Sequence, residues 1–146
     1  INIYEKEYSY YWGSKGIGNS LVKLLGNDHN LIVANRSNEG LESPNIKYIK
    51  FDVLEGSMPK EELPEHIDGF VYCPGSINLR PFKGLRPQNF SDDFNINVLG
   101  AITSLQSVLD LLLKIKPNFE EGIDRPIPLL YIINGGEDQA KILLQK

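Results

Sequence analysis

Apolar and polar residues in the first half of the chain form short blocks separated by glycine, proline and polar turns. Residues 17–26 (IGNSLVKLLG) repeat apolar side chains every three or four positions, which predicts a helix with Gly26 as its stop. Residues 31–35 (LIVAN) form a compact apolar run with the length of a buried strand. Residues 46–51 (IKYIKF) alternate apolar and basic side chains, which is typical of a strand with one exposed face.

The second half continues this alternation and contains the longest periodic segment of the chain. From Asn95 to Lys116 apolar residues recur every three or four positions, which predicts a long helix that Pro117 ends. Five shorter elements surround it: a short helix near 59–63, a buried strand within 66–75, a short helix or turn over 87–94, a strand over 127–133 and a closing helix over 137–146.

Strands that alternate with helices indicate an α/β protein with a mostly parallel sheet flanked by helices. Right-handed crossovers then favour a doubly wound, Rossmann-like fold, and a length of 146 residues predicts a single domain over 1–146. The first strand fits this scheme least well. Residues 5–12 (EKEYSYYW) contain aromatic residues that suit a sheet, but their charged residues and Ser9 suit a buried central strand poorly.

Composition and charge exclude several classes of function. Hydrophobic residues make up 41% and charged residues 23% of the chain, which are ordinary globular values. The net charge of −4 and the pI near 5.2 argue against a nucleic-acid or anionic-membrane partner. No apolar run approaches the roughly 20 residues of a membrane span. The lone cysteine, Cys73, and the start of the chain, which shows no signal peptide, favour the cytoplasm.

The remaining polar residues give little indication of other chemistry. His29 and His66 stand apart from each other and from further ligands, so we expect no metal site. Asp92 and Asp93 are interpreted as helix-start or surface charges rather than as an acid/base pair. The tyrosines of residues 4–11 are assigned to packing, because an acidic segment lacks the basic groove of a nucleic-acid binder.

The most informative stretch is WGSKGIGNSLVKLL followed by NLIVANRS. A glycine-rich turn that opens a helix leaves free N–H groups and a positive dipole end, which suit a diphosphate. Gly13, Gly16 and Gly18 permit positive φ angles and a close approach of the backbone to such a ligand. The alternative is a glycine turn that merely joins a strand to a helix, because a glycine triplet alone is a weak signal.

Here the triplet is followed in order by further motifs: NRS, FDV, YCPGS and NINVLGA. Together with GSKGIG they resemble the short-chain dehydrogenase/reductase family over roughly residues 13 to 105. The resemblance implies that the diphosphate is held by Gly13, Ser14, Gly16, Ile17 and Gly18 and the adenine by Asp52 and Val53. It also implies that Tyr72, Cys73, Pro74 and Gly75 replace the family's Asn-Asn-Ala-Gly turn, and that Asn97 is the helix asparagine that helps hold a proton-relay water.

The choice of cofactor has an electrostatic interpretation. Members of the family that bind NAD usually carry an acidic residue after the second strand, which accepts hydrogen bonds from the ribose. This chain has Asn35, Arg36 and Ser37 there, and Lys15 lies within the glycine turn. Two cations and no carboxylate favour the 2′-phosphate of NADP over NAD. The alternative is that Lys15 and Arg36 are solvated loop charges.

Three departures from the family pattern bear on activity. Trp12 stands where the family has its first glycine, and we expect the indole to limit cofactor affinity. The catalytic serine expected after the fifth strand is not found in NGGEDQ, and the family's Tyr-x-x-x-Lys is not found beyond it. The same spacing from Tyr11 to Lys15 overlaps the glycine turn and is interpreted as coincidence.

The resemblance therefore implies an NADP(H)-binding domain of a short-chain dehydrogenase/reductase-like oxidoreductase, inactive as it stands, whose complete relatives act on a small carbonyl compound or alcohol. The alternatives are a non-catalytic dinucleotide-binding or sensor module and an oligomerising scaffold subunit. The helix over 95–116 has apolar residues on more than one face, which predicts a homo-oligomer through this helix. Burial of the helix on two sides within one subunit is the alternative.

Overall fold

The computed structural model describes residues 7–11, 16–38, 43–114 and 129–132. Within these ranges five strands form one sheet in the order β3-β2-β1-β4-β5. The strands are β1 (Glu7–Tyr11), β2 (Asn30–Asn35), β3 (Ile46–Lys50), β4 (Gly69–Tyr72) and β5 (Leu129–Ile132). All four neighbouring pairs are parallel, so the carboxyl ends of all the strands lie at one edge. The predicted doubly wound, parallel α/β sheet is confirmed.

Strand β1 occupies the centre of the sheet, contrary to the expectation drawn from its polar residues. Tyr8 pairs with Leu31 of β2 and with Gly69 of β4, and Tyr11 pairs with Ala34 and Tyr72. A central strand forms backbone hydrogen bonds with two neighbours, and these bonds do not depend on the polarity of its side chains. The expectation that these polar residues suit a central strand poorly was therefore wrong.

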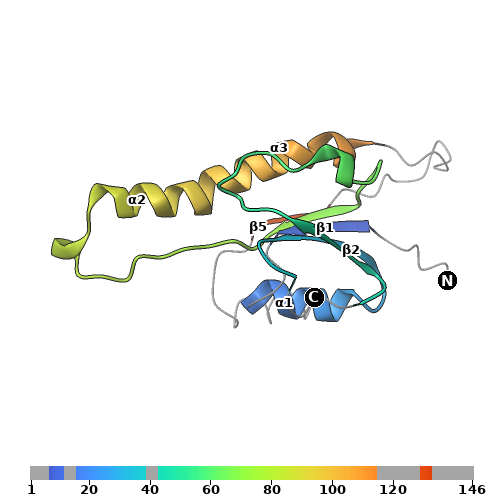
Figure 1. Cartoon of the computed structure of the whole chain (residues 1–146), viewed down its shortest axis with the longest axis horizontal. Helices are drawn as coiled ribbons and strands as arrows, with labels where there is room; N and C mark the ends of the chain where they lie inside the picture. Colours follow the sequence, from blue (N-terminus) through green and yellow to red (C-terminus); the bar gives the residue numbers. More distant parts are fainter. Residues whose placement is uncertain (1–6, 12–15, 39–42, 115–128, 133–146) are drawn as a thin grey trace.

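Helices cover both faces of the sheet (Figure 1). Helix α1 (Gly16–Leu25) lies on one face, where Leu21 and Val22 pack against alternate residues of β2 and against Val71 of β4. Helix α3 (Gly100–Leu113) lies on the other face and buries Val108 and Leu112. Because side chains alternate along a strand, β2 contributes to both cores, and this explains why its apolar run is continuous.

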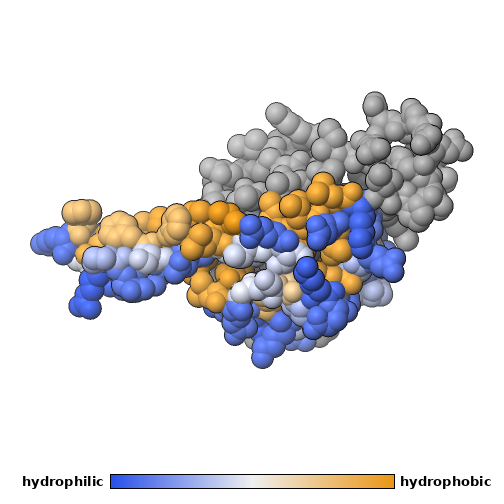
Figure 2. All heavy atoms as spheres, turned by 90° about the horizontal axis from the view of Figure 1, so that it is seen from above, coloured by the Kyte–Doolittle hydropathy of each residue, from blue (hydrophilic) through white to orange (hydrophobic). Residues whose placement is uncertain are grey.

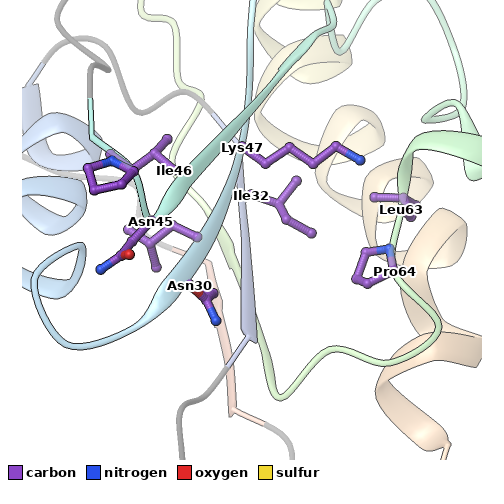
Figure 3. A pocket seen from close by; sticks show the side chains of 9 residues that line it. Asn30, Ile32, Asn45, Ile46, Lys47, Leu63 and Pro64 are labelled. Carbon is purple, nitrogen blue, oxygen red and sulfur yellow. The ribbon is translucent and has the colours of Figure 1, made fainter.

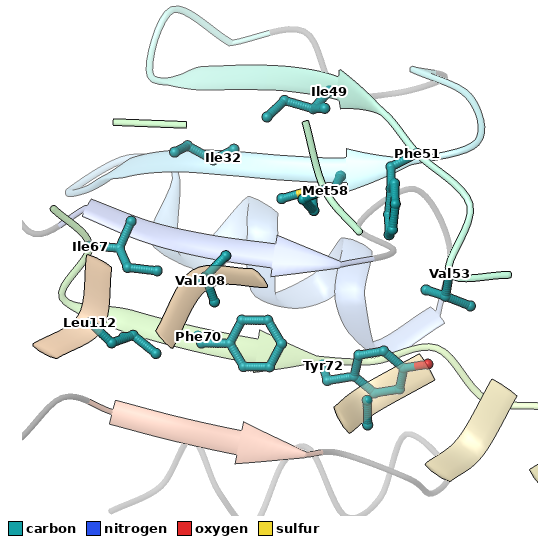
Figure 4. Close-up of a cluster of buried hydrophobic side chains, with 12 residues drawn as sticks. Ile32, Ile49, Phe51, Val53, Met58, Ile67, Phe70, Tyr72, Val108 and Leu112 are labelled. Carbon is teal, nitrogen blue, oxygen red and sulfur yellow. The ribbon is translucent and has the colours of Figure 1, made fainter. Parts of the chain in front are cut away.

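The larger core lies between the sheet and α3 (Figure 4). Phe70 and Tyr72 point from β4 into this core, and both are almost completely buried. The other buried members are Ile32, Ala34, Ile49, Phe51, Val53, Met58, Ile67, Ala101, Val108 and Leu112. Val53 and Met58 come from the connection between β3 and the short 3-10 helix η1 (Lys60–Glu62), so this connection is part of the core.

The segment from Pro87 to Leu113 is one continuous helix, although the sequence predicted a short element ending at Phe94 and a separate helix after it. It consists of α2 (Pro87–Phe94), a π-helical turn η3 (Asn95–Leu99) and α3. Asn95 has φ −61° and ψ −41°, so the backbone stays helical where a boundary was expected. Pro87 suits the first turn, which needs no N–H donor there.

Part of this helix projects beyond the sheet (Figure 1). We refer to residues 79–94, which include the 3-10 helix η2 (Phe82–Gly84) and α2, as the arm. Four of its large apolar side chains are exposed: Leu79, Phe82, Phe90 and Phe94. By length and composition alone, the 27-residue helix from Pro87 to Leu113 is also sufficient to cross a membrane, which corrects the expectation that no segment reaches that length. A helix that packs against a sheet passes the same test of length and composition, and α3 does bury residues against the sheet.

Candidate functional site

The loops that carry the sequence motifs meet at the carboxyl edge of the sheet. Strands β2 and β3 lie on one side of β1, and β4 and β5 lie on the other, so the connections leave β1 and β4 in opposite directions. In open parallel sheets such a reversal leaves a crevice at the carboxyl ends of the two strands, and ligands bind there. Helix α1 begins at this same side of the sheet (Figure 1). The candidate site is therefore the edge between β1 and β4.

The start of α1 has the backbone that a close ligand would require. Gly16 has φ +58°, a conformation that favours glycine, and a Cβ atom placed there would meet nothing within 4 Å. Ile17 packs against the smaller core and Gly18 is buried, so the first turn is fixed against the sheet. The first N–H groups of a helix have no partner within it and can bind an anion. The expected contributors Gly13, Ser14 and Lys15, and also Trp12, lie outside the described residues.

The loop after β2 holds the residues assigned to cofactor choice. Asn35 is only 4% exposed, and its Oδ1 accepts a hydrogen bond from the backbone N–H of Arg36 at 3.0 Å. The Nδ2 atom of Asn35 has no hydrogen-bond partner within the described part of the chain. The side chains of Arg36 and Ser37 are exposed at the same edge. Residues 35–37 thus combine a buried amide donor with an exposed guanidinium and a hydroxyl, and none of the three carries a carboxylate.

The loop after β3 is held by a hydrogen bond between a side chain and the backbone of the same loop. Oδ1 of Asp52 accepts a hydrogen bond from the N–H of Leu54 at 3.0 Å, which is the local turn that aspartate favours. Asp52 is half-buried at the edge, whereas Val53 is 5% exposed and belongs to the core. Burial, together with the charge of Asp52, raises the pKa of the Tyr72 hydroxyl above its usual value, so Tyr72 stays neutral.

Tyr72, at the end of β4, joins the sheet to the long helix. Its hydroxyl donates a hydrogen bond to the carbonyl of Ile96 in η3. A Cβ atom at Gly100 would lie 2.6 Å from the Tyr72 hydroxyl oxygen and 3.3 Å from Cβ of Val53. A side chain at this position would have to displace the buried Tyr72 hydroxyl or move the helix away from the sheet, so the packing favours glycine. The packing of Gly100 sets the distance between α3 and the candidate site.

The turn that follows β4 presents backbone rather than reactive side chains. Cys73 is half-buried, and burial raises the pKa of its thiol to about 12, so it is a neutral thiol at pH 7. Pro74 is buried and Gly75 is exposed at the edge. A neutral cysteine beside a proline and a glycine offers no nucleophile or general base. The turn can act as a wall for a ligand that binds at this edge.

Asn97 is placed at the same turn by the π-helical segment. Its Oδ1 accepts a hydrogen bond from the N–H of Ser76, and its Nδ2 donates one to the Ser76 carbonyl, both at 2.8 Å. The amide thus binds backbone as a neighbouring strand would. π-helical turns occur frequently at functional sites. The expected role of Asn97 in holding a proton-relay water stays a prediction.

Asp93 also contacts the turn after β4, although the sequence predicted a helix-start or surface charge at this position. One carboxylate oxygen accepts a hydrogen bond from Oγ of Ser76 at 2.7 Å, and the other accepts one from the N–H of Asn78 at 3.1 Å. These bonds lower the pKa of the Asp93 carboxyl group. The only sequence signal for this contact was the polar character of Ser76 and Asn78 in the loop PGSIN.

A cavity of about 310 Å³ lies at the opposite edge of the sheet (Figure 3). Ile32 and Lys47 face Leu63 and Pro64 across it, and Asn30 closes the end where β2 begins. This edge carries the amino ends of the strands, where α/β proteins do not usually bind ligands. Within the described ranges there is also no group of three or more His, Cys, Asp or Glu residues that could hold a metal ion.

Comparison with known proteins gives structural but not sequence matches. No family model and no curated protein sequence matches the chain. A short chain dehydrogenase from Leptospira borgpetersenii with bound NAD+ is similar, with a TM-score of 0.60, 20% identity, and coverage of 73% of this chain and 46% of that one. A short chain dehydrogenase family protein from Francisella tularensis is similar with a TM-score of 0.61 and 19% identity, and the match covers 78% of this chain and 55% of that one. The protein ElxO with NADP bound is similar with a TM-score of 0.56 and 24% identity, and the match covers 72% of this chain and 49% of that one.

These similarities establish the fold. The described sheet and helices have the Rossmann-like arrangement of short-chain dehydrogenase/reductase structures, so the resemblance suggested by the motifs is confirmed at the level of the fold. The chain spans about half the length of the structures that it matches.

Proposed function

We propose that this chain is the NADP(H)-binding portion of a short-chain dehydrogenase/reductase-like oxidoreductase. The main support for this proposal is that four motif-bearing segments meet at the carboxyl edge of the sheet. They meet between β1 and β4, where the connections leave in opposite directions. These segments are the start of α1 and the loops after β2, β3 and β4. Two of the similar structures contain bound NAD+ or NADP, which supports a dinucleotide as the ligand.

We propose a separate part of the dinucleotide for each segment. The start of α1, with Gly16 in a positive-φ conformation, suits the diphosphate. The loops after β2 and β3, with Asn35 and Asp52, suit the adenosine half. The unpartnered Nδ2 of Asn35 supports this, because a buried amide donor is stabilised by an acceptor. Gly75 and its neighbours after β4 then border the other half.

NADP is favoured over NAD by charge. Arg36 is exposed at the edge next to the adenosine side, and Lys15 lies in the glycine turn by sequence. Each can form a charge-assisted bond with a 2′-phosphate. An aspartate or glutamate that would favour the unphosphorylated ribose is not found at residues 35–37.

Chemistry on a substrate is a further part of the proposal. By the family resemblance the substrate is a small carbonyl compound or alcohol, and a polypeptide of residues 1–146 is expected to bind cofactor without transferring hydride. The family's serine and Tyr-x-x-x-Lys are not found after β5 in this sequence, and Cys73 is a neutral thiol at pH 7. A cytoplasmic location is supported by the lone Cys73, and the negative net charge argues against a nucleic-acid or anionic-membrane partner.

Titration calorimetry with NADPH and NADH tests the proposal. The chain is expected to bind NADPH more tightly, and Arg36→Asp is expected to narrow or invert this preference by roughly 2 to 4 kcal/mol, because a cation is replaced by a repelling anion. Lys23→Asp is the control. It makes the same charge change in the last turn of α1, away from the candidate site, and should leave the preference for NADPH unaltered. Equal affinities for the two cofactors in the unaltered chain contradict the NADP assignment, and no binding of either contradicts the function.

We also propose that the chain self-associates through the outer face of its long helix. Val98, Leu99, Ile102, Leu109 and Leu113 are between 39% and 65% exposed on this helix. Figure 2 shows hydrophobic residues along the projecting helix and over the body of the molecule. Such a row is wider than a helix needs to cover a sheet, and a symmetric pair of helices would bury it.

Light scattering tests this second proposal. Ile102→Lys combined with Leu109→Lys should convert a dimer into a monomer, because two charges would be buried in the contact. Leu24→Lys combined with Leu54→Lys, at two exposed apolar positions outside this helix, is the control and should leave the dimer intact. A monomer for the unaltered chain at tens of micromolar contradicts self-association.

A further inference from the structure

The segment that leaves β4 is held by hydrogen bonds rather than by regular secondary structure. We refer to residues 73–78 as the exit segment. The N–H and the carbonyl of Ser76 bind the side chain of Asn97, and Oγ of Ser76 binds Asp93. Asn78 donates its N–H to Asp93 and its side-chain amide to the carbonyl of Asn89 at 3.2 Å. The exit segment is thus tied to one face of the α2–η3 helix.

Within this cluster Asp93 has a distinct position. Its two carboxylate oxygens bind two residues of the exit segment separately, Ser76 at one oxygen and Asn78 at the other. Asp93 and Asn97 lie one helical turn apart, so together they hold both sides of Ser76. The hydrogen bonds that lower the pKa of Asp93 keep the carboxylate ionised at neutral pH.

Apolar burial does not fix the outer part of the exit segment. Ile77, between the two residues that Asp93 binds, is 74% exposed, and Leu79 just beyond is 83% exposed. Ser76 and Asn78 are only half-buried. A loop without buried apolar anchors samples many conformations unless polar contacts restrict it. The hydrogen bonds of Asp93 and Asn97 therefore determine the conformation of this segment.

The exit segment lies on the β4 side of the candidate site, where the second half of a dinucleotide would bind. In the Rossmann arrangement the adenosine ribose is read after the second strand, and the diphosphate lies at the start of the first helix. Strand β2 lies on one side of β1 and β4 on the other. A dinucleotide anchored at α1 with its adenosine over β2 must therefore place its nicotinamide half over the end of β4.

We propose that Asp93 is a positioning residue, which, together with Asn97, holds the exit segment in the conformation that the nicotinamide half of the cofactor contacts. The inference rests on the proposed function. Asp93 itself does not touch the cofactor, because both of its oxygens face the exit segment. Its effect on binding passes through the backbone of Ser76 and Asn78.

The test compares a whole cofactor with its adenosine half. Asp93→Ala removes both carboxylate oxygens and with them the hydrogen bonds from Oγ of Ser76 and from the N–H of Asn78. Calorimetry should show that NADPH binds roughly three- to tenfold more weakly to this variant, in keeping with one or two lost hydrogen bonds. Adenosine 2′,5′-bisphosphate should bind with unchanged affinity, because its site lies on the β2 side.

The chain offers a matched control and a second variant. Asp92→Ala makes the same change at the adjacent residue, whose carboxylate binds Gln88 on the exposed face of α2, and it should alter neither affinity. Ser76→Ala removes only the bond to one carboxylate oxygen and should weaken NADPH binding in the same direction as Asp93→Ala, but less. Circular dichroism checks that each variant is folded.

Each outcome decides between the two proposals. Unchanged NADPH affinity in Asp93→Ala overturns the positioning role, and so does an equal loss for NADPH and the bisphosphate, which would indicate a general loss of structure. An unaltered chain that binds both ligands equally well also overturns it, because no contact with the second half would exist. An unaltered chain that binds neither overturns the proposed function itself.

Discussion

The sheet core and the arm are stabilised by different interactions. In the core, Phe70 and Ile49 are completely buried among apolar neighbours. In the arm, Phe82 is 84% exposed, and polar contacts such as that of Asp93 with Ser76 connect the arm to the exit segment. Regions with few buried apolar contacts open more easily than a packed core. The comparison indicates that the core supplies stability, while the arm supplies a conformation at the candidate site.

The largest effect should come from truncating a phenylalanine of the core. Phe70→Ala should lower the free energy of unfolding by about 3 to 5 kcal/mol, because the lost side chain leaves a cavity beneath α3. Phe82→Ala in the arm is the matched control and should change it by no more than about 0.5 kcal/mol. Urea denaturation followed by circular dichroism measures both. Equal losses for the two variants would show that the arm is packed as firmly as the core.

A smaller effect is expected where the helix approaches the sheet. Gly100→Ala should lower the free energy of unfolding by about 1 to 3 kcal/mol, because its Cβ would lie 2.6 Å from the Tyr72 hydroxyl oxygen. Gly84→Ala, in the arm, is the control, because a Cβ there meets nothing within 4 Å. Combining Gly100→Ala with Tyr72→Phe should restore part of the loss. If the double variant loses the sum of both single effects, the clash is not the cause.

The smallest effect should be a pH dependence of the arm. The hydrogen bonds from Ser76 and Asn78 lower the pKa of Asp93 from its ordinary value of 3.8. The folded state then holds the proton less tightly than the unfolded state, so the carboxylate contributes stability above about pH 4. This contribution is lost as the pH falls through the lowered pKa. The stability difference between the unaltered chain and Asp93→Asn should therefore shrink below pH 4 in urea denaturation. A constant difference from pH 7 to pH 3 would contradict the lowered pKa.

Local patterns in the sequence predicted the secondary structure well. The helix expected over 17–26 is observed at Gly16–Leu25, and the strand expected over 31–35 is observed at Asn30–Asn35. These agreements arise because helical and strand periodicities depend on residues only a few positions apart. Where the local signal was interrupted by polar residues, as at Asn95, a boundary was predicted although the backbone stays helical. The closing helix expected over 137–146 lies outside the described residues.

The candidate site was only partly accessible from the sequence. Asn35 and Gly75 lie at the ends of predicted strand segments and Asp52 directly follows one, and parallel strands place such residues at one edge. The structure places them there. That Val53 packs into the core and that both ends of the Asn97 amide bind Ser76 could not be predicted, because these contacts depend on the distance between the helix and the sheet.

The sequence by itself determined the order of the elements, the parallel sheet and the segments that end at its carboxyl edge. Only the tertiary structure decided that β1 is central, that α2 and α3 form one helix with an exposed outer row, and that Asp93 holds the exit segment. The physical reason is the separation of the interacting groups along the chain. Periodicity arises from neighbours within about one helical turn, whereas Asp93 and Ser76 are 17 positions apart and come together only when the arm has returned to the sheet.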